Sequence, residues 1–284
     1  MNFISGSYFK SFCRHTVSDY TVSDYTSPRD FNFTYRIKED IENNFIFVKT
    51  ELLKAIIVSV NDGSIILPEN FILLTHNSDI NITDSIADQV LVELPKIKSW
   101  YAQNMLCDTA NVHPLPIGLA NPKWEHGRIS RFQKVAKQNL DKTEIVYVNF
   151  NIATNIHYRK DCLRQLGLKI NTVYPDNPSA LSYNEFVLAT QEKYLEDMAR
   201  SYFTVSPFGN GADCHKTWEA IYMKSIPIVI KTTMSSRFKL MGIPMLILND
   251  WSEYKDLKLS ESLYQKTWNN FKPEEMDFKY FISQ

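Results

Sequence analysis

The chain has 284 residues, of which 44% are hydrophobic and 22% charged, and its formal net charge is −1 at pH 7. This composition is typical of a folded globular protein, and the length favours two domains over one. The near-zero charge argues against non-specific nucleic-acid binding, and no apolar stretch reaches the roughly 18 residues of a membrane span, so we expect a soluble protein.

The first half of the chain alternates apolar runs with amphipathic stretches. Residues 43–50 and 71–75 predict strands, whereas residues 51–62 fit a helix or a strand. Residues 96–106 (KIKSWYAQNML) predict a helix, and the Pro-rich stretch 112–122 predicts a loop or a strand. A tandem repeat at Thr16–Tyr25 (TVSDYTVSDY) is interpreted as a surface loop, and the polar stretch 125–140 as a connector.

The same alternation restarts in the second half. Strands are predicted at 143–150, 202–207, 226–230 and 243–248, and helices at 157–166, within 182–201 and at 213–224. Strands that alternate with helices indicate βαβ units and parallel sheets. We therefore predict two α/β domains, residues 1–140 and 141–284, with the last helix as a candidate to pack back on the first domain.

The stretch SPFGNGADCHKTWEAIYMKSIPIVI, Ser206–Ile230, carries the strongest functional signal. An apolar strand runs into a loop with two glycines, Gly209 and Gly211, and then into a helix whose first turn holds His215 and Lys216. Backbone amides near glycine and at a helix N-terminus bind anions such as phosphate. Farther along the helix, Glu219 is placed to accept hydrogen bonds from ribose hydroxyls. The alternative is a plain turn with Asp213 as helix N-cap and a solvated glutamate.

This stretch resembles the SPRGNG-DCHRTWEAL…IPIV signature of exostosin-like glycosyltransferases, a family with short members in bacteria and large DNA viruses. Three further segments are similar to the same family: Leu73–Asp79 (LLTHNSD), Pro114–Gly127 (PLPIGLANPKWEHG) and Tyr147–Arg159 (YVNFNIATNIHYR). The family's usual Arg is Phe208 here. Another cation would then bind the diphosphate, and Arg159 is the first candidate and Lys216 the second.

The resemblance implies a GT-B fold, in which two Rossmann-like domains face each other across a cleft. It implies an inverting glycosyltransferase that moves a monosaccharide from a UDP-sugar, bound by the second domain, to a hydroxyl of a glycan held by the first. Xylose is one candidate sugar, beside galactose, glucuronic acid and N-acetylglucosamine. The alternative is a non-catalytic nucleotide- or carbohydrate-binding protein that retains the fold.

An inverting transfer needs a base beside the acceptor hydroxyl and stabilisation of the leaving diphosphate. Asp79, just past a buried strand, is the predicted base, with Asp84 and Glu93 as weaker candidates and an Asx-turn as its alternative role. The predicted acceptor-binding residues are His76, Trp124 and His126. As alternatives, His76 also fits a local hydrogen-bonding role and Trp124 fits plain packing. The predicted donor-binding residues are Asn149, Thr154, Arg159, Ser206, Gly209, Gly211, Asp213, His215, Lys216 and Glu219.

No metal or other cofactor is expected. The sequence has no Asp-x-Asp motif, by which GT-A enzymes hold a divalent ion, and its histidines show no short metal-ligand spacing. The four cysteines form no C-x-x-C pair, which favours a reducing compartment and hence the cytoplasm.

Overall fold

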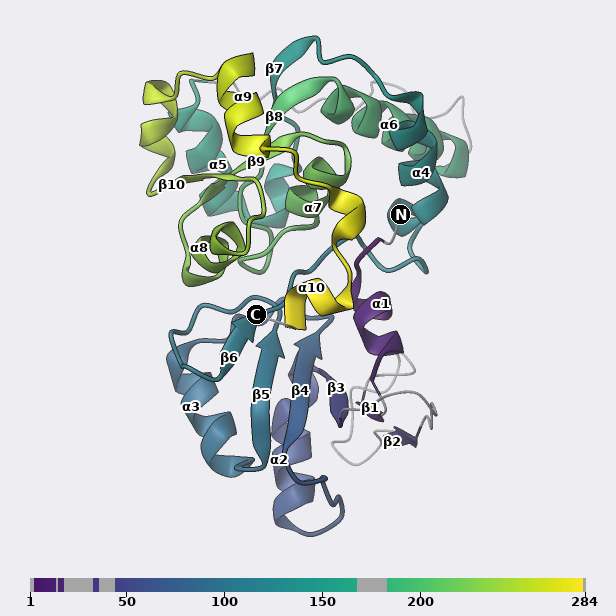
Figure 1. The fold of residues 1–284 in the computed structure, drawn as a ribbon, viewed down its shortest axis with the longest axis vertical. Coiled ribbons are helices and arrows are strands. Elements are labelled where there is room, and N and C mark those ends of the chain that lie inside the picture. Colours follow the sequence, from purple (N-terminus) through teal and green to yellow (C-terminus); the bar gives the residue numbers. More distant parts are fainter. Residues whose placement is uncertain (1–2, 14, 18–32, 36–43, 168–182, 283–284) are drawn as a thin grey trace. The chain divides into compact units, whose positions relative to one another are not determined.

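The computed structural model describes residues 3–13, 15–17, 33–35, 44–167 and 183–282 (Figure 1). It divides into two compact units. The six-strand unit comprises residues 2–117, 211–213 and 276–284, and the four-strand unit comprises residues 118–210 and 214–275. Residues 18–25 of the tandem repeat lie outside the described residues.

The six-strand unit is built on a mainly parallel sheet with the order β2-β1-β3-β4-β5-β6. Only β2, which pairs with β1, runs antiparallel among the described strands. The strands are β1 (His15–Val17), β2 (Phe33–Tyr35), β3 (Phe45–Lys49), β4 (Phe71–His76), β5 (Ile97–Ala102) and β6 (Val112–Pro114).

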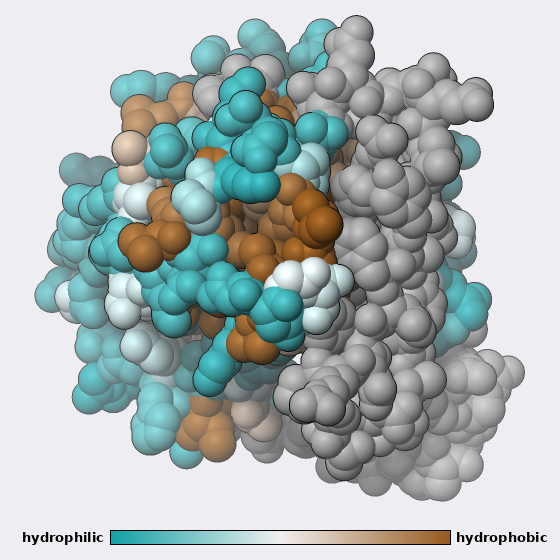
Figure 2. Space-filling model, turned by 90° about the horizontal axis from the view of Figure 1, so that it is seen from below, coloured by the Kyte–Doolittle hydropathy of each residue, from teal (hydrophilic) through white to brown (hydrophobic). Residues whose placement is uncertain are grey.

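Helices cover this sheet. On one face, α2 (Leu53–Asn61), which follows the 3-10 turn η1 (Thr50–Leu52), and α3 (Asp84–Glu93) join an apolar cluster with β3, β4 and β5. The two ends of the chain supply α1 (Gly6–Ser11) and α10 (Phe278–Ile282), whose aromatic rings pack together and against strand residues. Seen from below, Figure 2 shows hydrophobic residues interspersed with hydrophilic ones on the surface.

The predicted helix at 96–106 is wrong, because Ile97–Ala102 forms β5. This strand lies between β4 and β6, so it pairs on both sides. Trp100 is fully buried, and its indole N–H donates to Thr75 Oγ1, 2.8 Å away. Lys98 and Ser99 interrupt this strand, so it has neither the strict alternation of a half-buried strand nor the continuous apolar run of a strand covered on both faces.

The four-strand unit is built on a parallel sheet with the order β10-β9-β8-β7 (Figure 1). Its strands are β7 (Glu144–Tyr147), β8 (Ser201–Val205), β9 (Ile226–Ile230) and β10 (Leu246–Leu248). Its α-helices are α4 (Ile129–Gln138), α5 (Ile156–Gln165), α6 (Tyr183–Ala199), α7 (His215–Tyr222), α8 (Thr233–Leu240) and α9 (Glu261–Trp268). Its 3-10 turns are η2 (Glu125–Gly127), η3 (Ile152–Thr154), η5 (Trp251–Asp256) and η6 (Pro273–Glu275).

Helix α7, which connects β8 to β9, is packed tightly within the four-strand unit. Its residues from Lys216 to Tyr222 are all buried. Trp218 packs edge-on against Phe238 of α8, with ring centroids 5.0 Å apart. A separate apolar cluster joins β8 and β9 to α5, η5 and α9. The helix that carries the predicted anion-binding residues is therefore held by the core of its own unit.

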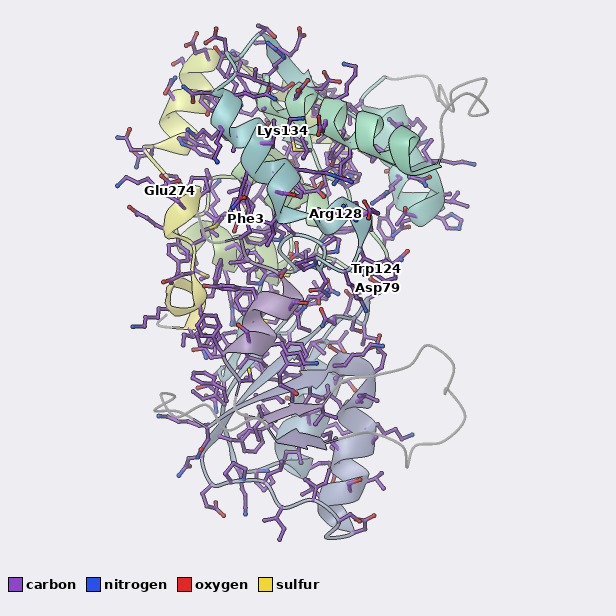
Figure 3. All side chains as sticks on the ribbon, turned by 90° about the vertical axis from the view of Figure 1, so that its right-hand side faces the viewer. Phe3, Asp79, Trp124, Arg128, Lys134 and Glu274 are labelled. Atoms are coloured by element: carbon purple, nitrogen blue, oxygen red, sulfur yellow. The ribbon has the colours of Figure 1, made fainter. Side chains whose placement is uncertain are left out.

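Residues 118–140 belong to the four-strand unit, whereas the sequence predicted a boundary near residue 140. Arg131 of α4 is 5% exposed and donates to both the backbone carbonyl and the carboxylate of Glu125 in η2. It also donates to Gln191 of α6, and Lys134 of α4 pairs with Glu192 of α6 at 2.7 Å. These contacts attach α4, which carries Lys134 (labelled in Figure 3), to α6.

The protein is thus a mixed α/β protein with two sheets of mainly parallel strands, as the alternating pattern predicted. Among the described helices, none is long and apolar enough to cross a bilayer.

Candidate functional site

The segment from β8 to β9 has the predicted strand–loop–helix–strand order. β8 ends at Val205 and α7 begins at His215, with Cys214 as an extended N-cap residue at φ −131° and ψ 134°. No side chain caps this helix start. The first N–H groups of a helix have no acceptor within the helix, and the N-terminus carries a partial positive charge.

Two buried cations lie in the four-strand unit near this helix start. Arg159 of α5 is 4% exposed and Lys216 of α7 is 7% exposed. The guanidinium donates from Nε to the Phe208 carbonyl (2.9 Å) and from Nη1 to the Asn151 carbonyl (2.5 Å), and its Nη2 lies 3.8 Å from Cys214 Sγ. All these acceptors are uncharged, so they orient the arginine without neutralising it.

Lys216 is linked to Glu219 through a tyrosine that the sequence did not single out. The Lys216 ammonium donates to Tyr194 Oη at 2.6 Å, and Tyr194 Oη donates to Glu219 Oε2 at 2.6 Å. The ammonium also lies 4.3 Å from the centre of the Tyr194 ring. Within the described part of the chain, neither Lys216 nor Arg159 has a carboxylate oxygen within ion-pair distance.

Burial governs the titration of this cluster. It lowers the pKa of Lys216 to about 8, because desolvation outweighs the attraction of Glu219. It raises the pKa of the Tyr194 phenol well above its usual value, and the neighbouring carboxylate of Glu219 adds to that rise. At neutral pH the site thus combines a protonated lysine, a neutral phenol and the permanently charged Arg159.

The loop after β8 is fastened by side chains on both flanks. Asn155 Nδ2 donates to the Gly209 carbonyl at 2.7 Å, and the hydroxyls of Ser206 and Thr217 lie 2.9 Å apart, both buried. His215 Nδ1 donates to the Gly118 carbonyl at 2.7 Å. The predicted donor residues Ser206, Gly209 and His215 therefore already have bonds that shape the loop.

Gly211 and Asp213 belong to the six-strand unit, and their contacts differ from those that the sequence predicted. The N–H of Ala212 donates to Asn81 Oδ1 (3.0 Å), and the N–H of Asp213 donates to Asn104 Oδ1 (2.8 Å). A β-carbon on Gly211 would lie 2.4 Å from Asn104 Nδ2. This glycine is thus explained by close packing, and two loop amides expected at an anion bond to asparagine side chains instead.

The remaining donor-side residues lie around the cluster. Asn149 and Thr154 are exposed, and the amide of Asn149 donates to Tyr147 Oη at 2.8 Å. Tyr147 packs edge-on against Tyr194, with ring centroids 5.8 Å apart. Three successive contacts, through Tyr147 and Tyr194, therefore link Asn149 to Lys216.

Trp124 (Figure 3) and His126 lie at the turn into α4, also in the four-strand unit. Trp124 is 53% exposed and its ring stacks on that of His126 at 6.4 Å. Partial burial lowers the pKa of His126, as does His215, whereas Glu219 opposes the shift. The turn is thus within electrostatic reach of the α7 cluster.

Asp79 and His76 lie in the six-strand unit, at the end of β4. Asp79 is exposed, in the loop after the strand (Figure 3). His76 is 1% exposed: its Nε2 donates to the Pro116 carbonyl at 2.9 Å, while its Nδ1 accepts from the Asn77 N–H at 2.7 Å. Because both nitrogens are bonded to backbone groups, His76 has the local hydrogen-bonding role that was one of its two predicted alternatives.

The two weaker base candidates each bond to a neighbour within the same unit. Asp84 Oδ1 accepts from the Asp108 N–H at 2.9 Å, and Glu93 Oε2 accepts from Asn61 Nδ2 at 2.9 Å. In the described part of the chain, no three His, Cys, Asp or Glu side chains gather as metal ligands would.

Comparison with known proteins adds no assignment: no protein-family model and no curated protein matches this chain.

Proposed function

We propose that this protein is an inverting glycosyltransferase, which transfers a monosaccharide from a UDP-sugar to a hydroxyl of a glycan. The observation that carries the proposal is the pair of buried cations, Arg159 and Lys216, near the start of α7, with no carboxylate of the described residues within ion-pair distance. Burying two charges without ion-pair partners is costly. An anionic ligand such as a nucleotide diphosphate would offset that cost.

The chemistry follows from the charges. In the proposed reaction the acceptor oxygen attacks the anomeric carbon from the face opposite to the diphosphate. The new C–O bond forms as the bond to the diphosphate oxygen breaks, and the electron pair leaves with UDP. Arg159 and Lys216 would stabilise the charge that develops on the leaving group, since fixed cations in a dry site are effective there.

The proton of the acceptor hydroxyl would pass to Asp79. A carboxylate on a loop at the end of a parallel strand is in the usual position for a ligand-facing group, and general-base catalysis typically contributes 10²–10⁴-fold. The GT-B arrangement, with the two units on either side of a cleft, is part of the proposal. Xylose is the first sugar to test, and no metal is invoked in the proposed step.

Glu219 is proposed to bind the ribose. A carboxylate can accept about four hydrogen bonds, and one oxygen of Glu219 accepts from Tyr194. The remaining capacity would suit two adjacent hydroxyls.

The test is a transfer assay with a panel of UDP-sugars and glycan acceptors. Its readouts are the amount of UDP released and the mass of the product. We expect one UDP-sugar to give an acceptor-dependent product with inverted anomeric configuration. A retained configuration would contradict the inverting mechanism. UDP binding without turnover on any acceptor would favour the non-catalytic alternative.

A further inference from the structure

Tyr194 occupies an unusual place between two residues of α7. Lys216 and Glu219 are three positions apart on the helix, a spacing at which opposite charges commonly pair directly. Instead, the phenol oxygen of Tyr194 from α6 lies 2.6 Å from the lysine nitrogen and 2.6 Å from a glutamate oxygen.

The direction of both hydrogen bonds is fixed by chemistry. An ammonium has only donors and a carboxylate only acceptors, so the single phenol proton must point to Glu219 while the phenol oxygen accepts from Lys216. The phenol thereby satisfies both buried groups without joining them. Two of the three ammonium hydrogens are not used in this bridge, and they can be donated to a ligand.

We propose that Tyr194 is a positioning residue of the anion site, which holds Lys216 and Glu219 apart and so keeps the ammonium for the diphosphate and the carboxylate for the ribose. This inference rests on the proposed function. In the absence of the phenol, the two side chains would close into a direct ion pair. That pair would neutralise the ammonium and occupy the carboxylate at the same time.

The bridge makes a distinct prediction for pH dependence. Arg159 and burial both favour the neutral form of Lys216, whereas Glu219 and Cys214 favour the charged form. With its pKa at about 8, Lys216 should lose its proton, and the site its affinity for UDP, as the pH rises above that value. Several charged or titratable groups face this bridge: Arg159 of α5, Cys214 and Glu219 of the α7 segment, and Tyr147 of β7. His126 of η2 faces it through Glu219.

The experiment compares wild-type protein with Tyr194→Phe, which keeps the ring and removes the bridge. NMR titration of the lysine side chains reports protonation of Lys216 without any ligand. We expect a midpoint near pH 8 in the wild type and a higher midpoint in Tyr194→Phe, where a direct ion pair favours the ammonium. UDP titrations at pH 7 should show at least roughly tenfold weaker binding by the variant. A tenfold change corresponds to about 1.4 kcal/mol of binding free energy. An unchanged or lowered midpoint would overturn the inference, as would unchanged UDP affinity.

Tyr202→Phe is the matched control. Tyr202 is on β8 in the same unit, and its ring packs edge-on against that of Tyr264 in α9. The Tyr202→Phe variant should have the same Lys216 titration midpoint and the same UDP affinity as the wild type. If the wild type itself binds no UDP, the proposed function fails, while the ligand-free titration still decides whether Tyr194 separates the pair.

Discussion

The carboxylate of Asp213 accepts a hydrogen bond from the backbone N–H of Ile117 at 2.7 Å, although 96 residues separate the two in the chain. Asp213 is 5% exposed, and its own N–H donates to Asn104 Oδ1. Both residues belong to the six-strand unit. The loop that precedes α7 is thus fixed to the segment after β6 by a buried charge-assisted bond.

Replacing Asp213 should therefore lower stability. In Asp213→Ala the Ile117 N–H loses its acceptor in a buried setting, which costs about 1–3 kcal/mol in the free energy of unfolding. Urea denaturation measures that loss, and Asp213→Asn, which retains a carbonyl oxygen, should lose less. Equal stability of Asp213→Ala and the wild type would contradict the role given to this bond.

Gly211→Ala should also destabilise the protein, because the added methyl would lie 2.4 Å from Asn104 Nδ2. Overpacking of this kind typically costs about 1–3 kcal/mol. The double variant Gly211→Ala/Asn104→Ala removes the opposing atoms, so the glycine substitution should cost less in that background. A cost that is the same in both backgrounds would show that the packing explanation is wrong.

Asp79→Asn should lower kcat by about 10²–10⁴-fold, because the amide cannot take the acceptor proton. UDP binding, measured by calorimetry, should stay within about twofold, since the proposed base does not contact the nucleotide. Asp88→Asn is a suitable control, because Asp88 is an exposed residue of α3 in the same unit. Full activity of Asp79→Asn would remove this residue from the mechanism.

Lys216 should shape the dependence of stability on pH. Its folded-state pKa of about 8 lies below the ordinary lysine pKa of 10.5, so between these values the unfolded chain binds more protons than the folded one. Stability therefore rises with pH across this window, by on the order of 3 kcal/mol. This rise in the free energy of unfolding should be absent in Lys216→Met. Denaturation of both proteins across the pH window therefore measures the contribution of Lys216 as the difference between their profiles. Parallel pH profiles of the two proteins would contradict the assignment.

The sequence predicted β4, β8, α7 and β9 well, because buried strands and an amphipathic helix leave a local pattern. Gly167, just past the end of α5, has φ +70°, a conformation that favours glycine at this position. The pattern failed at β5, because Lys98 and Ser99 interrupt the mostly apolar run that marks β4, β8 and β9. Local periodicity cannot report which segments become neighbours.

The candidate site was predictable only in part. Arg159 and Lys216 are both buried near the start of α7, as the proposed anion role requires. Tyr194 was missed, because its role depends on how α6 packs over α7 and no spacing within α6 indicates it. Gly211 looked like an anion-loop glycine, yet the constraint on it comes from Asn104, more than 100 residues earlier.

The most direct test of the central claim is calorimetric titration of UDP into the wild type and into Arg159→Met and Lys216→Met at pH 7. The two-cation site predicts that the wild type binds UDP, and that each variant binds at least roughly tenfold more weakly, since a charge-assisted contact is worth about 1.5–3 kcal/mol. Thermal unfolding of all three proteins checks that the variants are folded. Absence of UDP binding by the wild type, or unchanged affinity in both folded variants, would contradict the claim that Arg159 and Lys216 form a nucleotide diphosphate site.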